Sequence, residues 1–237
     1  KNIIASGATI FKGEATFINK NKIKINNDII SGDKIIIASG GTPISLKVLG
    51  SHFADDSDTI MQLSKLPKTL TIVGAGYIAI EFAFIFANLG SGVSLIVRKN
   101  ILRGFDDNLV DEIKKNLIRK KVKIYFNNEV KEIKKYKNKF DVCLKNKTIK
   151  SERVLVAIGR KPNIKSLNLN EVGIKLNSIG AIKVNKKLQT NITNIYAIGD
   201  VTDRFNLTPV AIAEGHALAD KLFSSKNKEV DLSYIGT

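Results

Sequence analysis

The central part of the chain alternates short apolar runs with longer, helix-like ones. Residues 69–73 form an apolar, β-branched run without alternation, which is typical of a strand buried on both faces of a parallel sheet. Residues 77–89 are rich in apolar side chains and stop at Gly90, which predicts a helix. Residues 93–97 repeat the buried-strand pattern. This order predicts a β-α-β unit.

The alternation continues toward the C-terminal side. Residues 107–120 predict an amphipathic helix, with apolar side chains on one side at Leu109, Val110, Ile113, Leu117 and Ile118. We expect a strand at residues 122–126, a strand-turn-strand at 131–144 and an apolar strand at 152–158. Strands alternating with helices between residues 69 and 127 predict an α/β fold, a Rossmann-like domain with a parallel sheet.

Both ends of the chain are richer in strands. Short β-branched runs bounded by Asn, Gly and Asp predict strands at residues 15–18, 22–25 and 34–38, and shorter ones at 181–184 and 195–198. Helices are expected near residues 57–66 and at 210–223. These flanks predict a second unit to which both ends of the chain contribute.

Composition narrows the function classes. The 237 residues suit one large or two small domains, and the absence of any apolar stretch of about 18 residues argues against a membrane span. The formal charge of +16 is spread over scattered lysines without interleaved aromatic residues, so we expect no nucleic-acid partner. The one cysteine, Cys143, excludes a disulfide framework, is expected to be a small core residue, and fits a cytoplasmic protein.

The turn after the first buried strand carries the clearest chemistry. Gly74-Ala75-Gly76-Tyr77-Ile78-Ala79 matches G-x-G-x-x-G/A, between a predicted strand and a predicted helix. Gly74 permits the tight turn, Gly76 lets a pyrophosphate approach the backbone, and Ala79 keeps the helix close to the strand. The helix N-terminus then favours the phosphates. The motif predicts dinucleotide binding; the alternative is a glycine turn without a ligand.

The end of the second strand indicates which dinucleotide binds. NAD-binding folds usually place Asp or Glu there to hold a ribose hydroxyl. This chain has Arg98 and Lys99 instead, followed by Arg103. Guanidinium groups bind phosphate oxygens through paired hydrogen bonds, so these residues favour the 2′-phosphate of NADPH. The alternative is that they are ordinary solvated basic residues.

The motifs resemble those of the pyridine-nucleotide disulfide reductases, and among them the glutathione reductases. The resemblance covers the Gly74–Ala83 segment, Val97-Arg98-Lys99 with Leu102–Asp106, and Ala157-Ile158-Gly159-Arg160-Lys161-Pro162-Asn163. It extends to Ile195-Tyr196-Ala197-Ile198-Gly199-Asp200, Leu207-Thr208-Pro209-Val210-Ala211 and Ile37–Pro43. These segments span nearly the whole chain.

The resemblance implies roles for individual residues. Tyr77 would cover a flavin and move aside for nicotinamide, and Glu81 would approach the nicotinamide, so both would be catalytic. Ile158 and Gly159 would border the nicotinamide, with Ile78 and Arg160 also in the cofactor site. Gly199, Asp200, Leu207 and Thr208 would contact FAD, with Asp200 accepting hydrogen bonds from its hydroxyls and Thr208 at a helix start near the flavin. The expected cofactors are therefore NADPH and FAD, without a metal.

The same resemblance suggests a division of the chain. Residues 1–66 and 183–226 would belong to an FAD-binding domain, residues 67–182 would bind NADPH, and residues 227–237 would begin an interface domain. The family's redox-active cysteine pair, its first FAD fingerprint and its catalytic histidine motif are missing, and the chain begins with Lys1. We therefore expect an inactive fragment of a homodimeric parent.

The parent's substrate is the least determined point. The resemblance favours glutathione disulfide, while lipoamide, mercuric and trypanothione reductases are the nearest alternatives. A non-catalytic nucleotide-binding module is a further alternative. His52 and His216 do not match the family's catalytic histidine, so both are expected to be structural, with His216 on a helix surface.

Overall fold

The computed structural model describes residues 2–224, 229–233 and 235. It divides into a central unit, Pro43–Arg160, and a terminal unit formed by Lys1–Thr42 with Lys161–Thr237. The chain crosses between them at β5 (Gly41–Pro43) and β13 (Arg160–Pro162). The expectation that both ends of the chain build one unit is thus confirmed. The assignment of residue ranges to NADPH and FAD stays a prediction.

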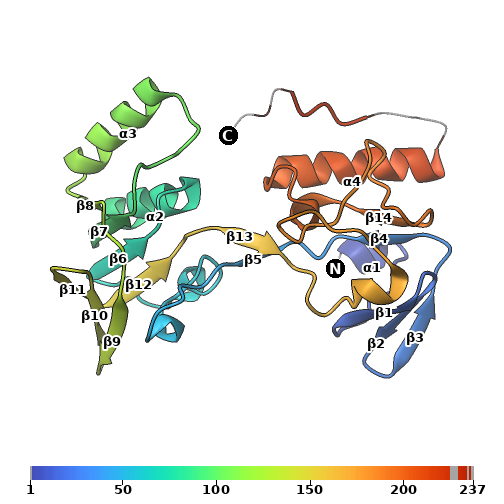
Figure 1. The fold of residues 1–237 in the computed structure, drawn as a ribbon, viewed down its shortest axis with the longest axis horizontal. Helices are drawn as coiled ribbons and strands as arrows, with labels where there is room; N and C mark the ends of the chain where they lie inside the picture. Colours follow the sequence, from blue (N-terminus) through green and yellow to red (C-terminus); the bar gives the residue numbers. More distant parts are fainter. Residues whose placement is uncertain (1, 225–228, 234, 236–237) are drawn as a thin grey trace. The chain divides into compact units, whose positions relative to one another are not determined.

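A four-stranded parallel sheet forms the middle of the central unit (Figure 1). Its order is β12 (Arg153–Val156), β6 (Thr69–Val73), β7 (Gly92–Val97) and β8 (Lys123–Phe126). One face packs on α2 (Tyr77–Asn88) and α3 (Asp107–Arg119), through a core that includes Leu70, Ile72 and Leu95. This is the predicted Rossmann-like β-α-β arrangement.

The other face of the parallel sheet packs against three antiparallel strands. These are β9 (Glu132–Tyr136), β10 (Lys139–Cys143) and β11 (Thr148–Ser151), in the order β11-β10-β9. Val73 and Ile96 from the parallel sheet meet Ile133, Val142 and Ile149 in this second core. The hairpin of β9 and β10 is the predicted strand-turn-strand; Cys143 is only half-buried at its end.

Helix α3 has a narrower apolar face than the sequence predicts. Its first turn is capped by Asp106, which accepts hydrogen bonds from the N–H groups of Asn108 at 3.0 Å and Leu109 at 3.2 Å. Val110 and Leu117 are buried, but Leu109 and Ile118 are each 64% exposed. At 100° per residue these two flank the stripe of Val110, Ile113 and Leu117 on opposite sides, so neither reaches the core.

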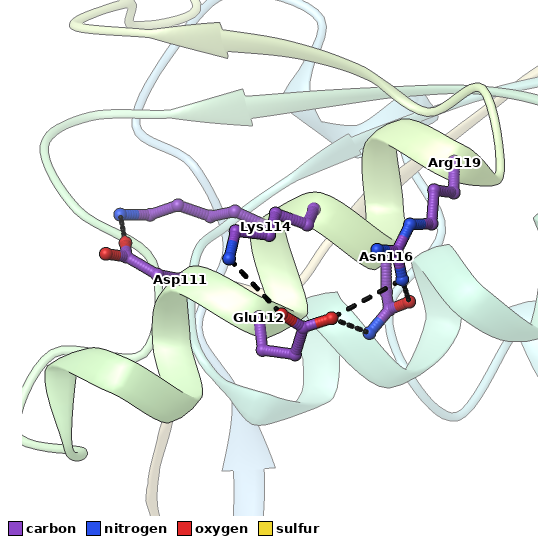
Figure 2. A network of polar contacts seen from close by, with 6 residues as sticks. Asp111, Glu112, Lys114, Asn116 and Arg119 are labelled. Atoms are coloured by element: carbon purple, nitrogen blue, oxygen red, sulfur yellow. Dashed lines mark hydrogen bonds and ion pairs between the residues drawn. The ribbon is translucent and has the colours of Figure 1, made fainter.

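Polar side chains cover the outer face of α3. Figure 2 shows Lys114 beside Asp111 and Arg119 beside Glu112 and Asn116. The Lys114–Asp111 pair is 2.9 Å long, and side-chain hydrogen bonding by Lys114 lowers the pKa of Asp111. Exposed pairs of this kind contribute little stability. We therefore regard this surface as a solvated helix face.

The terminal unit combines a small antiparallel sheet with a parallel pair of strands. β1 (Ala15–Asn19), β2 (Lys22–Ile25) and β3 (Asp28–Ser31) form the sheet, and β4 (Ile35–Ile37) pairs in parallel with β14 (Ile195–Ala197). The remaining elements are helices α1 (Asn2–Ala5) and α4 (Thr208–Phe223) and short 3-10 helices η3 (Leu169–Val172) and η4 (Gly199–Thr202); the central unit adds η1 (Ser51–Phe53) and η2 (Ile60–Gln62).

Two expected elements are not formed as predicted. Residues 57–66 contain only the 3-10 turn Ile60–Gln62, because the Asp56 side chain accepts hydrogen bonds from the N–H groups of Asp58 and Thr59 and favours a turn. Residues 181–184 form no strand, since their N–H groups go to separate partners such as Val201 and Lys175. The strands β3 and β11 were not anticipated.

Candidate functional site

The turn after β6 has a backbone that requires glycine at its first position. Gly74 has φ +150°, and its N–H donates to the carbonyl of Ile96 at 3.1 Å. A Cβ at Gly74 would collide with the carbonyl oxygen of Ala157. Ala79 is fully buried at the start of α2, so the helix lies close against the strand.

Gly76 differs, because the space beside it is open. It is the N-cap of α2, has an extended backbone (φ −81°, ψ 178°), and a Cβ there would meet nothing within 4 Å. No side chain caps this helix end. Because backbone N–H groups and the helix dipole favour an anion there, the turn suits a phosphate group that approaches the backbone at Gly76.

The loop after β7 is attached to the glycine turn. The N–H of Leu102 donates to the carbonyl of Ala75 at 2.7 Å, and Leu102 and its neighbour Ile101 are buried in the core below α2. Leu102 also adopts a left-handed backbone (φ +48°). This anchoring places the loop of residues 98–103 beside the turn.

Three basic residues flank that anchor in the sequence. Arg98, Lys99 and Arg103 are all exposed. Among the residues that the structure describes, none of the three takes part in an ion pair. Their charge is therefore available to an incoming anion, whereas Arg119 and Arg153 are engaged with Glu112 and Asp55.

One face of α2 is exposed within the central unit. Tyr77, Glu81 and Ile85 follow each other at four-residue spacing, and Tyr77 is 37% and Ile85 47% exposed. The carboxylate of Glu81, which is unusual in an apolar run, thus belongs to the exposed face. Ile78 is half-buried and packs against the core.

The strand β12 is followed by the segment Ile158-Gly159-Arg160. Ile158 is 40% exposed and Gly159 has φ +133°. The side chain of Arg160 contacts the distant loop that contains Ser57 and Asp58. Its Nη1 lies 3.1 Å from Oγ of Ser57 and 3.7 Å from Oδ1 of Asp58. The structure thus gives Arg160 a supporting contact that the sequence did not predict.

The terminal unit brings together the second group of predicted site residues. Gly199 has φ +69°, and its N–H donates to Oε2 of Glu214 on α4 at 2.7 Å. A Cβ at Gly41 would lie 3.4 Å from Cβ of Asp200, so the Gly40-Gly41 segment passes close to that aspartate. Leu207 is the N-cap of α4 and Thr208 its exposed first residue, again without a side-chain cap.

Glu214 is a residue of this site that sequence reasoning missed. It is only 1% exposed, and its Oε1 lies 2.7 Å from Nη2 of Arg204. Through Oε2 it also holds the N–H of Gly199, so one buried carboxylate joins the loop of Arg204 to the start of η4. The signal was a carboxylate in a mostly apolar helix. The exposed neighbour His216 is on the helix surface as predicted.

Comparison with known proteins decides the family. The model of the family described as "Pyridine nucleotide-disulphide oxidoreductase" matches residues 1–215 of this chain. The chain belongs to this family. It is 36% identical to a glutathione reductase of Nostoc sp. over 98% of the chain and 54% of that protein. It is 39% identical to a trypanothione reductase of Trypanosoma congolense (90% of the chain, 44% of that protein) and 32% to a mercuric reductase of Lysinibacillus sphaericus (95% and 43%).

A solved structure supports the same family. The HOCl-induced flavoprotein disulfide reductase RclA from Escherichia coli matches with a TM-score of 0.88 and 31% identity, over 93% of this chain and 52% of that one. The chain therefore spans about half the length of the relatives it matches. In the described part of the chain, no helix is long and apolar enough to cross a membrane, and no cluster of His, Cys, Asp and Glu could hold a metal ion.

Proposed function

We propose that this chain is the NADPH-binding part of a flavin-dependent disulfide reductase whose substrate is glutathione disulfide. The observation that supports the proposal is the hydrogen bond from Leu102 to Ala75, which joins the loop that carries Arg98, Lys99 and Arg103 to the glycine turn. Backbone N–H groups for a diphosphate and guanidinium groups for a further phosphate are thus present together. NADPH carries a diphosphate and a 2′-phosphate, whereas NADH has the diphosphate alone.

The residues of the central unit fit the cofactor. The open space at Gly76 would admit the pyrophosphate, while the uncapped start of α2 favours its charge. Arg98 and Arg103 would hold the 2′-phosphate, with Lys99 adding to the positive field. Tyr77 and Glu81 on the exposed face of α2, with Ile158 and Gly159, would receive the nicotinamide.

The terminal unit fits part of a flavin site. Asp200 would accept hydrogen bonds from FAD hydroxyls, held in place because Gly199 is fixed to the buried Glu214. Leu207 and Thr208 at the uncapped start of α4 would lie near the flavin, where the helix dipole stabilises negative charge. When bound, NADPH supplies a hydride and FAD takes it up. The side chains of this chain bind, orient and shield the two groups.

Glutathione disulfide as the substrate rests on the relatives and on sequence motifs. Leu207-Thr208-Pro209-Val210-Ala211 and the arginine pair favour a glutathione reductase, as does the likeness to the Nostoc enzyme. Trypanothione and mercuric reductases remain alternatives, since their likeness is similar. The parent protein is proposed to be a homodimer, as the resemblance implies.

The 237-residue chain alone is expected not to reduce glutathione disulfide with NADPH. Thiol–disulfide exchange needs a thiolate pair, and this sequence has only Cys143. The measurement is NADPH oxidation followed by absorbance, with FAD and glutathione disulfide added. A chain extended to include a redox cysteine pair is the positive control. Turnover by the 237 residues at a rate comparable with that control would contradict the proposal that this chain binds NADPH but lacks the thiolate pair needed to reduce the disulfide.

Replacing Gly76 with Ala tests the dinucleotide site directly. The new methyl group meets no protein atom, and alanine is a poorer N-cap than glycine, so the free energy of unfolding should fall by only about 1 kcal/mol. It occupies the space for the pyrophosphate, so we expect NADPH to bind at least about tenfold more weakly, or about 1.4 kcal/mol. NADPH fluorescence titration measures the affinity and urea unfolding the stability. Unchanged NADPH affinity would mean that the diphosphate does not bind at this turn.

A further inference from the structure

A hollow lies in the central unit at the edge of the parallel sheet opposite the glycine turn. It has a volume of about 360 Å³ and is lined by the first residues of β6, β7 and β8, by residues before β8, and by β11. The glycine turn and Arg98 follow the carboxyl ends of β6 and β7 instead. The hollow is therefore separate from the proposed dinucleotide site.

The face of the parallel sheet that packs against the antiparallel strands changes from apolar to polar side chains where the hollow begins. The row Val73, Ile96 and Tyr125 runs across three strands and packs against the antiparallel sheet. The next row toward the amino ends is Thr71, Ser94 and Lys123, in the same register. Thr71 is fully buried, and its hydroxyl lies 2.5 Å from that of Ser151 on β11. A buried hydrogen bond between Thr71 and Ser151 thus replaces the apolar contact between the two sheets, and the half-buried Ser94 is the hydroxyl of this row that borders the hollow.

The rim of the hollow is positive. Lys121, Lys123 and Lys147 line it, and no lining residue is acidic. Nζ of Lys147 lies 4.7 Å from the centroid of the Tyr125 ring, which holds this ammonium group at the wall. Within the described ranges none of the three lysines forms an ion pair. Lys150 also lines the hollow, and in the strand register it lies opposite Asp141, whose negative charge reduces its contribution to the positive rim.

We propose that this hollow binds a small anion carrying several phosphate groups. Ammonium groups act as point charges on phosphate, and the hydroxyl group of Ser94 can donate a hydrogen bond to its oxygens. A concave surface lined by one sign of charge concentrates the potential. The volume is within the range of small-molecule pockets. A compact polyanion therefore matches the site better than a nucleic-acid strand.

The test is titration of the 237-residue chain with inorganic tripolyphosphate by calorimetry, with one equivalent of NADPH present, because excess NADPH is itself a polyphosphate anion and would compete for the hollow. Because the two sites lie at opposite edges of the sheet, NADPH should not abolish tripolyphosphate binding. The double variant Lys123→Gln/Lys147→Gln should bind at least about tenfold more weakly, since two charge-assisted contacts are lost. The matched control Lys139→Gln/Lys145→Gln removes the same charge from exposed lysines that do not line the hollow, and should change affinity less than about twofold.

A second variant keeps the proposal open to refutation if the lysine variant folds poorly. Ser94→Asp puts a negative charge into the hollow and leaves every lysine in place, so it too should weaken tripolyphosphate binding. The proposal is overturned if tripolyphosphate fails to bind, if the pocket and control variants lose affinity equally, or if one equivalent of NADPH displaces it. It also fails if a single-stranded oligonucleotide binds more tightly than tripolyphosphate and is equally weakened in both lysine variants, since that indicates a general basic surface. Failure of NADPH binding itself is a separate result and concerns the glycine turn.

Discussion

Arg98→Glu is expected to weaken NADPH binding by about 3 kcal/mol or more, roughly a hundredfold. The variant loses a charge-assisted hydrogen bond to the 2′-phosphate, worth about 1.5–3 kcal/mol, and adds repulsion between two negative groups. Arg98 is exposed and makes no ion pair in the described part of the chain, so the fold itself should not change. Fluorescence titration with NADPH measures the loss.

Two comparisons give this prediction its specificity. NADH lacks the 2′-phosphate, so its affinity should be nearly the same for the parent chain and Arg98→Glu. Lys137→Glu, in the exposed turn between β9 and β10, makes the same change in net charge away from the site and should leave NADPH affinity almost unchanged. If NADPH bound to Arg98→Glu as well as to the parent chain, the assignment of the 2′-phosphate to this loop would be wrong.

Gly74→Ala is expected to lower the free energy of unfolding of the central unit by about 3 kcal/mol or more. Gly74 has φ +150°, a conformation that a residue with a Cβ rarely adopts, and the added atom would collide with the backbone oxygen of Ala157. Backbone cannot rotate away as a side chain can, so β6 and β12 must separate. Urea unfolding followed by far-UV circular dichroism measures the change.

The neighbouring substitution Gly76→Ala is the matched control for stability. It adds the same methyl group two residues later, into open space and an extended backbone. The pair should therefore separate two functions of one motif, with Gly74 needed for folding and Gly76 for ligand approach. Equal stability of the two variants would show that the turn relaxes more easily than its geometry indicates.

The sequence predicted the parallel sheet well because three of its strands, β6, β7 and β12, are mostly buried. Residues 69–73 form a continuous apolar run, and β6 has the same bounds. The tight turn at Gly74 was predicted equally well, because its φ of +150° is a conformation that residues with a Cβ rarely adopt, whereas the extended backbone of Gly76 does not itself require glycine. The buried face of helix α3 was predicted less well from the sequence. Leu109 and Ile118 fit a helical period, but they are exposed and lie outside the stripe that reaches the core.

The features that sequence could not predict depend on contacts between distant residues. Arg160 donates a hydrogen bond to Ser57, about 100 positions away in the sequence, and no local sequence pattern predicts that contact. Glu214 stands out as a carboxylate in a mostly apolar helix, but only the fold places Arg204 and the N–H of Gly199 against it. The hollow at the amino ends is of the same kind, because β11 contributes its wall through a hydrogen bond between Thr71 and Ser151.

The interrupted course of the terminal unit has a consequence for synthesis on the ribosome. Ile35 of β4 pairs with Ile195 of β14, so the neighbouring strand is made about 160 residues later. At about 5–20 residues per second this delay is roughly 8 to 32 seconds. The central unit is continuous in sequence and can finish folding during that time. Until β14 is made, β4 lacks this partner, and an unpaired strand edge can pair with another chain and aggregate.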